Sequence, residues 1–357
     1  MLFVTNGHGE AAIAARIADE TRRLAAVRTD HFGLVGEALG SAGFADVGPS
    51  RAMPSGGLVA MGNVRAFARD LGAGFAGLLV RQVKFLHAVR GRYAAIVAVG
   101  DAYGCALARI AGTPLVYVGT AKSVYVAPYG AGERRILRAA RRVFVRDAAT
   151  AADLRRHGVA AEAPGNVIVD LVAGEAQVDW RAPLRLALLP GSRERAYADA
   201  LRIAAVVAAL RVRGIELDAV LSIAPNLELA RFAPALERGG LRPWTGPLGA
   251  LLHGATIAIG QSGTANEAAA SQGIPVVALD LDDAPRDAWY RKRQMGLLGD
   301  ALLVVPGDPG RAADELAALL ADELRRARMG ALGRERMGGP GGARAIAGAL
   351  VALAAAA

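Results

Sequence analysis

Residues 184–193 read Leu-Arg-Leu-Ala-Leu-Leu-Pro-Gly-Ser-Arg, and an Ala- and Leu-rich stretch follows them. Leu184–Pro190 has the aliphatic run of a buried strand, and Glu194–Leu210 has the period of a helix. The small residues Gly191 and Ser192 therefore make a turn between a strand and a helix. Such a unit predicts a doubly wound α/β domain with a parallel sheet.

The same alternation of short aliphatic runs and helical stretches continues along the chain. In the first half, we predict strands at Leu2–Thr5, Leu58–Met61, Ala95–Val99, Leu115–Val118 and Arg142–Val145. The helices between them are predicted at Ala11–Ala26, Val64–Arg90, Ala102–Ala111 and Ala131–Ala140. In the second half, the strands are Leu184–Leu188, Asp218–Ile223, Thr256–Ile259, Pro275–Leu279 and Ala301–Val305. Two Rossmann-like domains are the economical interpretation.

Their boundaries follow from loss of periodicity. We expect an N-terminal domain over 1–170, a linker over 171–183, a C-terminal domain over 184–345 and a final helix over 346–357, with a return of that helix to the first domain as an option. In such a pair we expect ligands in the cleft between the domains, where strand ends meet helix starts.

Composition limits the compartment and the partners. Hydrophobic residues make up 53% of the chain, which indicates well-packed cores, and a single cysteine, Cys105, excludes an internal disulfide. The apolar stretches Leu71–Val80 and Ile346–Ala357 are shorter than the roughly 20 residues that cross a bilayer. We therefore expect a cytoplasmic protein.

The net charge of +9 lies mostly in residues 1–170. Such a bias suits an anionic membrane surface, an acidic substrate or nucleic acid, but an arginine-rich composition explains it equally, since only three of the 42 cations are lysines. Because no helix-turn-helix, zinc-finger or base-stacking pattern is present, we expect no nucleic-acid partner.

Two turns of the second half have the pattern of anion sites. In the first, Gly191, Ser192 and Arg193 precede a helix, where backbone N–H groups, the helix dipole and a guanidinium favour a diphosphate. An ordinary turn with an exposed arginine is the alternative. The second, Gly260-Gln261-Ser262-Gly263-Thr264-Ala265-Asn266-Glu267, also opens a helix. There Thr264 and Glu267 fit a capping box, and Glu267 alternatively accepts hydrogen bonds from a ribose.

Polar residues also follow strands of the first half. Asn6-Gly7-His8-Gly9-Glu10 ends the first strand, and its glycines allow close approach of a ligand, with His8 or Glu10 facing the cleft. The alternatives are a loop histidine bonded to backbone and a first-turn acid. Asp101 follows another strand and is either a general base or a helix N-cap.

Lys122 and Ser123 follow a further strand of the first half, within Gly119–Tyr125. A lysine retained among so many arginines suggests a point-charge contact to phosphate, with a solvated loop lysine as the alternative.

Together these motifs resemble the lipid-A-disaccharide synthase family of GT-B glycosyltransferases, and more closely its related branch, over roughly residues 1–345. The resemblance rests on Ser-Gly-Thr-Ala at 262–265 with Glu267, Leu-Leu-Pro-Gly-Ser-Arg at 188–193 and Pro-Gly-Asn-Val-Ile-Val-Asp at 164–170. Asn-Gly-His-Gly-Glu and Thr-Ala-Lys-Ser at 120–123 resemble the related branch. One departure concerns the surroundings of Asp101. Where the family has Gly-x-Asp-Ala-Pro-Asp, this chain has Val-Gly-Asp-Ala-Tyr-Gly at 99–104, so it keeps the first aspartate and lacks the second.

The resemblance implies a GT-B fold, an acceptor-binding N-terminal domain and a UDP-sugar-binding C-terminal domain. It implies donor contacts from residues of the two anion-binding turns: Gly191, Ser192, Arg193, Ser262, Gly263, Thr264, Ala265 and Glu267. It places the acceptor or the cleft at Asn6, Gly7, Gly9, Glu10, Lys122 and Ser123. We expect Asp101, or else His8, to be the catalytic base of an inverting hexosyl transfer.

No cofactor or metal is expected, because the helix dipoles together with Arg193 supply the positive field that a metal would otherwise provide. The partners we expect are a nucleotide sugar and a lipid or glycan acceptor; the oligomeric state stays open. A UDP-sugar epimerase or hydrolase and a non-catalytic nucleotide-sugar-binding protein are the rival hypotheses.

The basic amphipathic stretch Val64–Arg92 suggests peripheral contact with the inner face of the cytoplasmic membrane. A domain helix with its apolar face in the core explains the same pattern.

Overall fold

The computed structural model describes residues 1–35, 43–51, 72, 74–112, 114–120, 122–172, 178–281 and 285–356. The predicted strand Leu58–Met61 and the first part of the predicted helix Val64–Arg90 lie outside these residues. The chain forms two compact units, one of Met1–Leu171 with Gly338–Ala357 and the other of Val172–Met337. It therefore passes between the units at 171–172 and again at 337–338, whereas the sequence analysis placed the second passage after residue 345.

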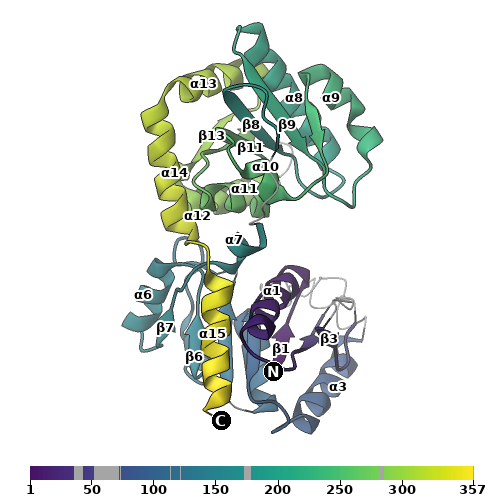
Figure 1. Cartoon of the computed structure of the whole chain (residues 1–357), viewed down its shortest axis with the longest axis vertical. Coiled ribbons are helices and arrows are strands. Elements are labelled where there is room, and N and C mark those ends of the chain that lie inside the picture. The colour runs from purple at the N-terminus through teal and green to yellow at the C-terminus, as the bar shows by residue number, and fades with distance from the viewer. Residues whose placement is uncertain are drawn as a thin grey trace. The chain divides into compact units, whose positions relative to one another are not determined.

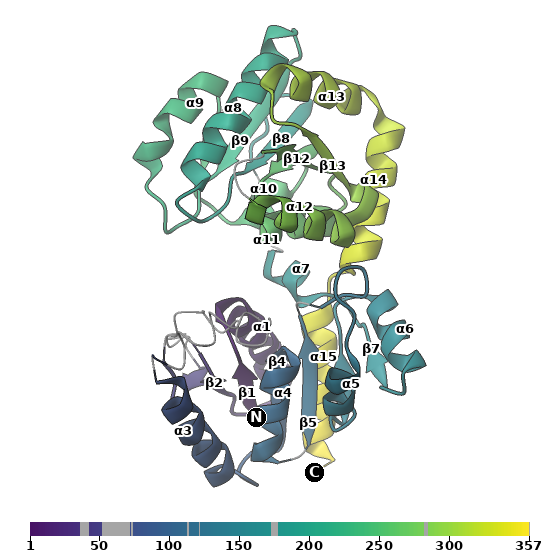
Figure 2. The same ribbon diagram turned by 180° about the vertical axis from the view of Figure 1, so that it is seen from behind.

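The first unit contains a parallel sheet with the order β3-β2-β1-β4-β5-β6-β7, whose strands are labelled between Figures 1 and 2. Its strands are β1 (Leu2–Thr5), β2 (Asp30–Gly33), β3 (Ala45–Asp46), β4 (Ile96–Gly100), β5 (Leu115–Gly119), β6 (Arg142–Phe144) and β7 (Ala161–Glu162). Because side chains alternate along a strand, Leu2 and Val4 join the core on one face, and Phe3 joins the core on the other.

Helices cover both faces of this sheet. The helices of this part of the chain are α1 (His8–Leu24), α3 (Phe75–Ala88), α4 (Ala102–Ala108), η2 (Arg109–Ala111), α5 (Ala131–Leu137), α6 (Ala148–Arg156) and α15 (Gly342–Ala355), with α7 (Val167–Val172) at the boundary to the second unit. α1 and α15 lie side by side on one face, where Ile13, Ile17, Ile346 and Leu350 pack with Phe3 (Figures 1 and 2). The returning C-terminal helix thus completes one core of the first unit.

Asp170 fastens this returning helix. Its Oδ1 accepts a hydrogen bond from the backbone N–H of Gly341 at 2.6 Å, and its Oδ2 accepts one from Ala343 at 2.7 Å. Gly165 packs so closely on the same segment that a Cβ there would lie 2.7 Å from the nitrogen of Gly342. The stretch 164–170, which carries part of the family resemblance, therefore holds the start of α15.

The second unit contains a parallel sheet with the order β10-β9-β8-β11-β12-β13. Its strands are β8 (Leu184–Leu189), β9 (Leu217–Ser222), β10 (Arg242–Trp244), β11 (Ile257–Gly260), β12 (Val276–Asp280) and β13 (Leu302–Pro306). Its helices are α8 (Ala196–Val212), η3 (Leu229–Phe232), α9 (Ala233–Gly239), α10 (Leu248–Leu252), α11 (Gly263–Ser271), α12 (Pro285–Leu298), η4 (Gly299–Ala301), α13 (Pro309–Ala321) and α14 (Glu323–Met337). The predicted fold class, two doubly wound parallel-sheet domains, is confirmed.

The amphipathic stretch can be followed from residue 75 onward. The buried residues of α3 are Phe75, Leu78, Gln82 and Leu86, so its apolar side faces the core of its own unit. This is the domain-helix arrangement that we considered as the alternative to membrane contact. Among the described helices, none combines the length and the apolar character that crossing a bilayer requires.

Candidate functional site

Each sheet has a point where the strand order reverses, and open α/β sheets bind ligands there, at the carboxyl ends of the strands. In the first unit β1 lies between β2 and β4, and in the second β8 lies between β9 and β11. The candidate residues follow these strands. Each unit therefore presents one candidate site.

In the second unit, strand pairing brings the two glycine-containing turns together. Leu189 is the register partner of Gly260, and the backbone N–H of Gln261 donates to the carbonyl of Leu189 at 3.0 Å. Beyond the strands, a Cβ on Gly191 would lie 3.7 Å from Cβ of Ser262. The turns that were predicted separately thus form one surface.

The start of α11 differs from the predicted capping box. Ser262 is the N-cap in an extended conformation, and its side chain makes no capping hydrogen bond. Thr264 lies inside the first turn and is exposed, so the Thr264–Glu267 box does not form. Backbone N–H groups at this helix start are therefore not satisfied by the cap side chain, which suits an anion.

The turn that carries Arg193 is held in place by its neighbours, while Arg193 itself is exposed. Nδ2 of Asn226 donates to the carbonyl of Ser192 at 2.8 Å. Glu194 pairs with Arg231, whose guanidinium lies 3.7 Å from the ring centroid of Tyr197. α8 begins at Ala196, two residues after the predicted start, because residues 193–197 first form a tight turn.

In the first unit, Asn6 joins residues from two helices. Its backbone N–H donates to Oε2 of Glu10 at 2.7 Å, and its Nδ2 donates to Oδ2 of Asp101 at 3.0 Å. Oδ1 of Asp101 accepts from the backbone N–H of Gly104 at 2.7 Å and caps α4. Asp101 is therefore an N-cap and at the same time a member of a carboxyl pair at the strand ends.

Within this group, Glu10 is the residue whose pKa is shifted by its surroundings. Burial, and then the charge of Asp101, raise the pKa of Glu10 to about 8, against a smaller opposing effect of the Asn6 N–H. Gly100 makes room for this carboxyl: its φ is 121°, and a Cβ there would overlap the Glu10 carboxyl. Sequence reasoning missed this contact, although a glycine at a strand end can signal close approach.

The other predicted residues of this loop differ in their surroundings. His8 begins α1, and its side chain lies outside the described part of the structure. Gly7 is the N-cap in an extended conformation open to any residue, and a Cβ on Gly9 would meet no atom within 4 Å. The choice between Asp101 and His8 as the base thus stays a prediction.

Lys122 and Ser123 take part in contacts within the first unit. Nζ of Lys122 lies 2.6 Å from Oε2 of Glu133 and 5.5 Å from the ring centroid of Tyr129. Ser123 is buried, and its Oγ accepts a hydrogen bond from the hydroxyl of Thr150 at 3.5 Å. Both residues hold the loop that follows β5, and neither contacts the Glu10–Asn6–Asp101 group in any described interaction.

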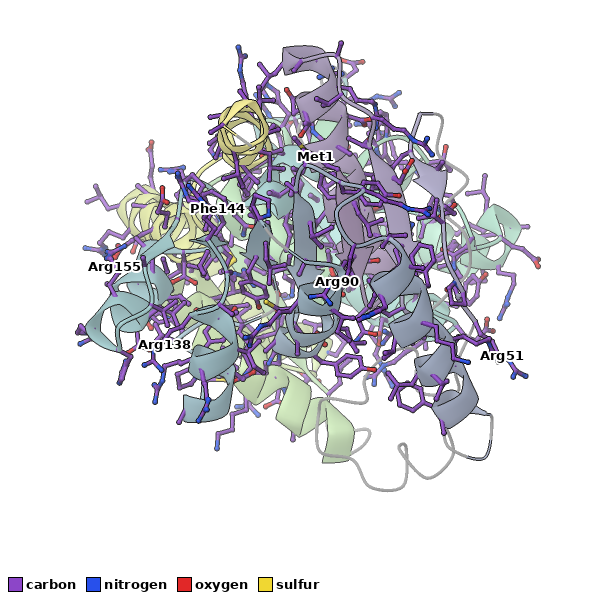
Figure 3. All side chains as sticks on the ribbon, turned by 90° about the horizontal axis from the view of Figure 1, so that it is seen from below. Met1, Arg51, Arg90, Arg138, Phe144 and Arg155 are labelled. Carbon is purple, nitrogen blue, oxygen red and sulfur yellow. The ribbon has the colours of Figure 1, made fainter. Side chains whose placement is uncertain are left out.

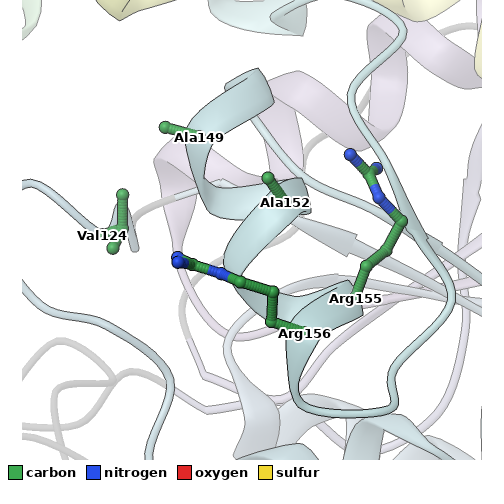
Figure 4. Close-up of a pocket in the computed structure, with 5 residues that line it drawn as sticks. All are labelled: Val124, Ala149, Ala152, Arg155 and Arg156. Carbon is green, nitrogen blue, oxygen red and sulfur yellow. The ribbon is translucent and has the colours of Figure 1, made fainter.

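A groove of about 700 Å³ lies on the first unit, lined by Val124, Ala149, Ala152, Arg155 and Arg156 (Figure 4). Its two arginines have partners: Arg155 donates to the carbonyl of Ala161 at 2.8 Å, and Arg156 pairs with Asp153 at 3.2 Å. We assign no ligand to this groove. Within the described ranges, no three His, Cys, Asp or Glu side chains gather into a group that could hold a metal ion.

No protein-family model and no curated protein matches the chain. Solved structures do match over nearly its whole length. MurG of Acinetobacter baumannii has a TM-score of 0.59 at 13% identity, with 98% of both chains covered. The calicheamicin glycosyltransferase CalG4 has a TM-score of 0.63 at 16% identity, with 98% of both chains covered.

A UDP-GlcNAc 2-epimerase from Neisseria meningitidis, bound to UDP-GlcNAc, has a TM-score of 0.57 at 13% identity, covering 98% of this chain and 99% of that chain. At these identities the likeness establishes the fold, which is GT-B. It does not establish an activity.

Proposed function

We propose that the chain is an inverting glycosyltransferase that moves a hexosamine-type sugar from a UDP-sugar to a lipid-linked or saccharide acceptor, as in lipid-A-disaccharide synthase. The observation that carries this proposal is the contact between the two anion-binding turns at Gly191 and Ser262. Of the structures that resemble this chain, CalG4 is named a glycosyltransferase and the Neisseria epimerase holds UDP-GlcNAc.

The donor diphosphate binds at the start of α11, where backbone N–H groups and the helix dipole favour an anion. Arg193 adds a bidentate guanidinium contact, and Glu267 binds the ribose hydroxyls. The other donor contacts come from Gly191, Ser192, Gly263, Thr264 and Ala265. These groups supply the positive field that a metal supplies elsewhere, so the reaction is metal-independent.

On the first unit, Asp101, with His8 as the alternative, removes the proton of the acceptor hydroxyl. Its two oxygens each accept one N–H bond, and each retains a lone pair for the acceptor. In this proposal, Asn6, Gly7, Gly9 and Glu10 contribute to acceptor binding, and so do Lys122 and Ser123 from the loop after β5.

A UDP-sugar 2-epimerase is the second candidate. It is favoured because Glu10, whose pKa is raised, lies beside a second carboxyl group, that of Asp101. An epimerase must both take and give a proton, and carboxyls with different charge states suit that task. An epimerised nucleotide formed without any acceptor would identify this activity. Nucleotide binding without turnover would instead indicate a non-catalytic binding protein.

The acceptor side is proposed to work at the inner face of the cytoplasmic membrane. Exposed arginines occur on several elements of the first unit, and Arg51, Arg90, Arg138 and Arg155 are labelled in Figure 3. Val80 of α3 is 54% exposed beside the exposed Arg81 and Lys84. Flotation with anionic vesicles tests this contact, and absence of the protein from the vesicle fraction counts against it.

The proposed function is tested by calorimetry of UDP, UDP-N-acetylglucosamine, other nucleotide sugars and NAD. The wild type is compared with Arg193→Ala and Glu267→Ala. The donor site is supported if the wild type binds uridine nucleotides and both variants do not. It is overturned if the wild type binds none of the nucleotides.

A further inference from the structure

Glu10 and Asp101 approach Asn6 from two different elements. Glu10 lies in the first turn of α1, and Asp101 immediately precedes α4. Because Asn6 donates to one oxygen of each carboxyl, at 2.7 and 3.0 Å, the two groups are held close together. Two neighbouring carboxyls resist ionising together, so an arrangement of this kind favours a single proton on the pair.

The hydrogen bonds indicate where this proton resides. Both oxygens of Asp101 accept N–H bonds, one from Asn6 and one from Gly104, and such donors favour the charged form of a carboxyl. Glu10 accepts at Oε2 alone in the described contacts, so its proton belongs on Oε1. The raised pKa of Glu10, about 8, agrees with this assignment.

Two titratable side chains near the pair that the structure describes are themselves uncharged. Tyr103 and Cys105 on α4 have pKa values raised by burial to about 12, so both are neutral. Among the described side chains, Asp101 carries the charge that acts on Glu10. The side chain of His8 on α1 lies outside the described part of the structure.

A neutral acid beside a carboxylate offers one hydrogen-bond donor and one acceptor. A ligand hydroxyl needs this combination, because it can accept from Glu10 Oε1–H while it donates to Asp101. Two carboxylates would offer acceptors only, and a phosphate or carboxylate ligand would be repelled by Asp101. The pair therefore selects a neutral hydroxyl.

We propose that Glu10 is a catalytic hydrogen-bond donor that orients the acceptor hydroxyl, an alcohol or sugar group, while Asp101 takes its proton. This role rests on the proposed function. The acceptor oxygen bonds to the anomeric carbon of the donor sugar as the bond from that carbon to the diphosphate breaks. The electron pair leaves with the diphosphate, and the proton passes to Asp101 and then to solvent.

The first test needs no ligand. The full chain and Glu10→Gln are titrated potentiometrically, and the wild type is expected to release about one more proton between pH 7 and 9. In Asp101→Asn, whose side chain can still cap α4, this release shifts to lower pH because the neighbouring charge is gone. Equal proton release by wild type and Glu10→Gln overturns the proposal.

The second test measures UDP release from UDP-N-acetylglucosamine with glycerol as the acceptor, from pH 6 to 9.5. The wild-type rate is expected to fall about tenfold per pH unit above about pH 8, where Glu10 loses its proton. Glu10→Gln keeps an N–H donor, so its rate stays within about tenfold of wild type at pH 7 and does not fall above pH 8. A wild-type rate that rises through pH 8, or a hundredfold loss in Glu10→Gln at pH 7, overturns the role.

Binding of UDP separates this inference from the proposed function. If UDP binds and the one-proton difference is missing, the role of Glu10 fails alone. If the proton difference is present and UDP does not bind, the proposed function fails and the protonated pair stands. If free UDP binds but the protein forms no UDP from UDP-N-acetylglucosamine, the potentiometric titration decides whether Glu10 is protonated, and its failure overturns the role of Glu10.

Discussion

The two units share the strand order around their switch points and differ in the chemistry that they present there. The second unit offers an uncapped helix start at Ser262 and the exposed cation Arg193. The first offers the buried amide of Asn6 with the carboxyls of Glu10 and Asp101. Topology thus selects where a ligand binds, whereas the residues after the strands select the charge of that ligand.

The two units should differ most in how their strand-end glycines tolerate a side chain. Gly100 and Gly191 both have positive φ, 121° and 116°, but a Cβ would overlap Glu10 in the first case and make an ordinary contact in the second, 3.7 Å from Cβ of Ser262. We expect Gly100→Ala to lower the free energy of unfolding by about 3 kcal/mol or more, and Gly191→Ala by about 1 kcal/mol. Urea unfolding of both variants measures this, and equal losses contradict it.

The second prediction concerns the charge that the second unit offers to a ligand. Arg193→Ala should weaken UDP binding about 100-fold, because a charge-assisted contact to the diphosphate is lost. Arg238 on α9 is also exposed and serves as the matched control, since Arg238→Ala should leave the affinity unchanged. Calorimetry compares the two, and equal affinities in both variants speak against the donor site.

The third prediction compares how the units hold their helix starts. Asp170 accepts two backbone N–H bonds at the start of α15, whereas Asp308 accepts one, from Arg311 at 2.9 Å, at the exposed start of α13. Asp170→Ala should lower the free energy of unfolding by about 2 kcal/mol and Asp308→Ala by about 1 kcal/mol. Thermal unfolding that ranks them in the opposite order is incompatible with the capping role of Asp170.

The last prediction is a gradual pH dependence, expressed per pH unit, in the first unit. Between its ordinary pKa and about 8, Glu10 is protonated in the folded chain and ionised in the unfolded chain. Stability of the wild type relative to Glu10→Gln should therefore fall as pH rises from about 5 to 8 and level off above. Because one proton is linked to unfolding over this range, we expect a slope of at most about 1.4 kcal/mol per pH unit. Parallel stability curves for both proteins refute the protonated state.

The central strands were predictable because they are short aliphatic runs. β1 has the predicted bounds, and β4, β5, β6, β8, β9, β11, β12 and β13 fall within one residue of theirs. The edge strand β10 was missed, since it is short and contains Arg242 and Pro243. β2 was missed because Asp30 and His31 are polar, and their partners Tyr93 and Asp46 are remote in sequence.

The positions of the candidate sites were predictable, and their contacts were not. Turns after strands are visible as Gly-Ser-Arg or Gly-Asp in the sequence. The pairing of Asn6 with Asp101, however, spans 95 residues and depends on the parallel register of β1 and β4. The capping prediction at Thr264 was wrong because the helix begins earlier, at Gly263, directly after Ser262.

The return of α15 to the first unit has a consequence for synthesis on the ribosome. The core around Ile13 and Phe3 includes Ile346 and Leu350, which are translated after the whole of residues 172–337. At about 5–20 residues per second, that delay lasts on the order of 10–30 s. During this interval the apolar face of α1 in the nascent chain is not yet covered by α15, so a chaperone that binds apolar surfaces can bind there.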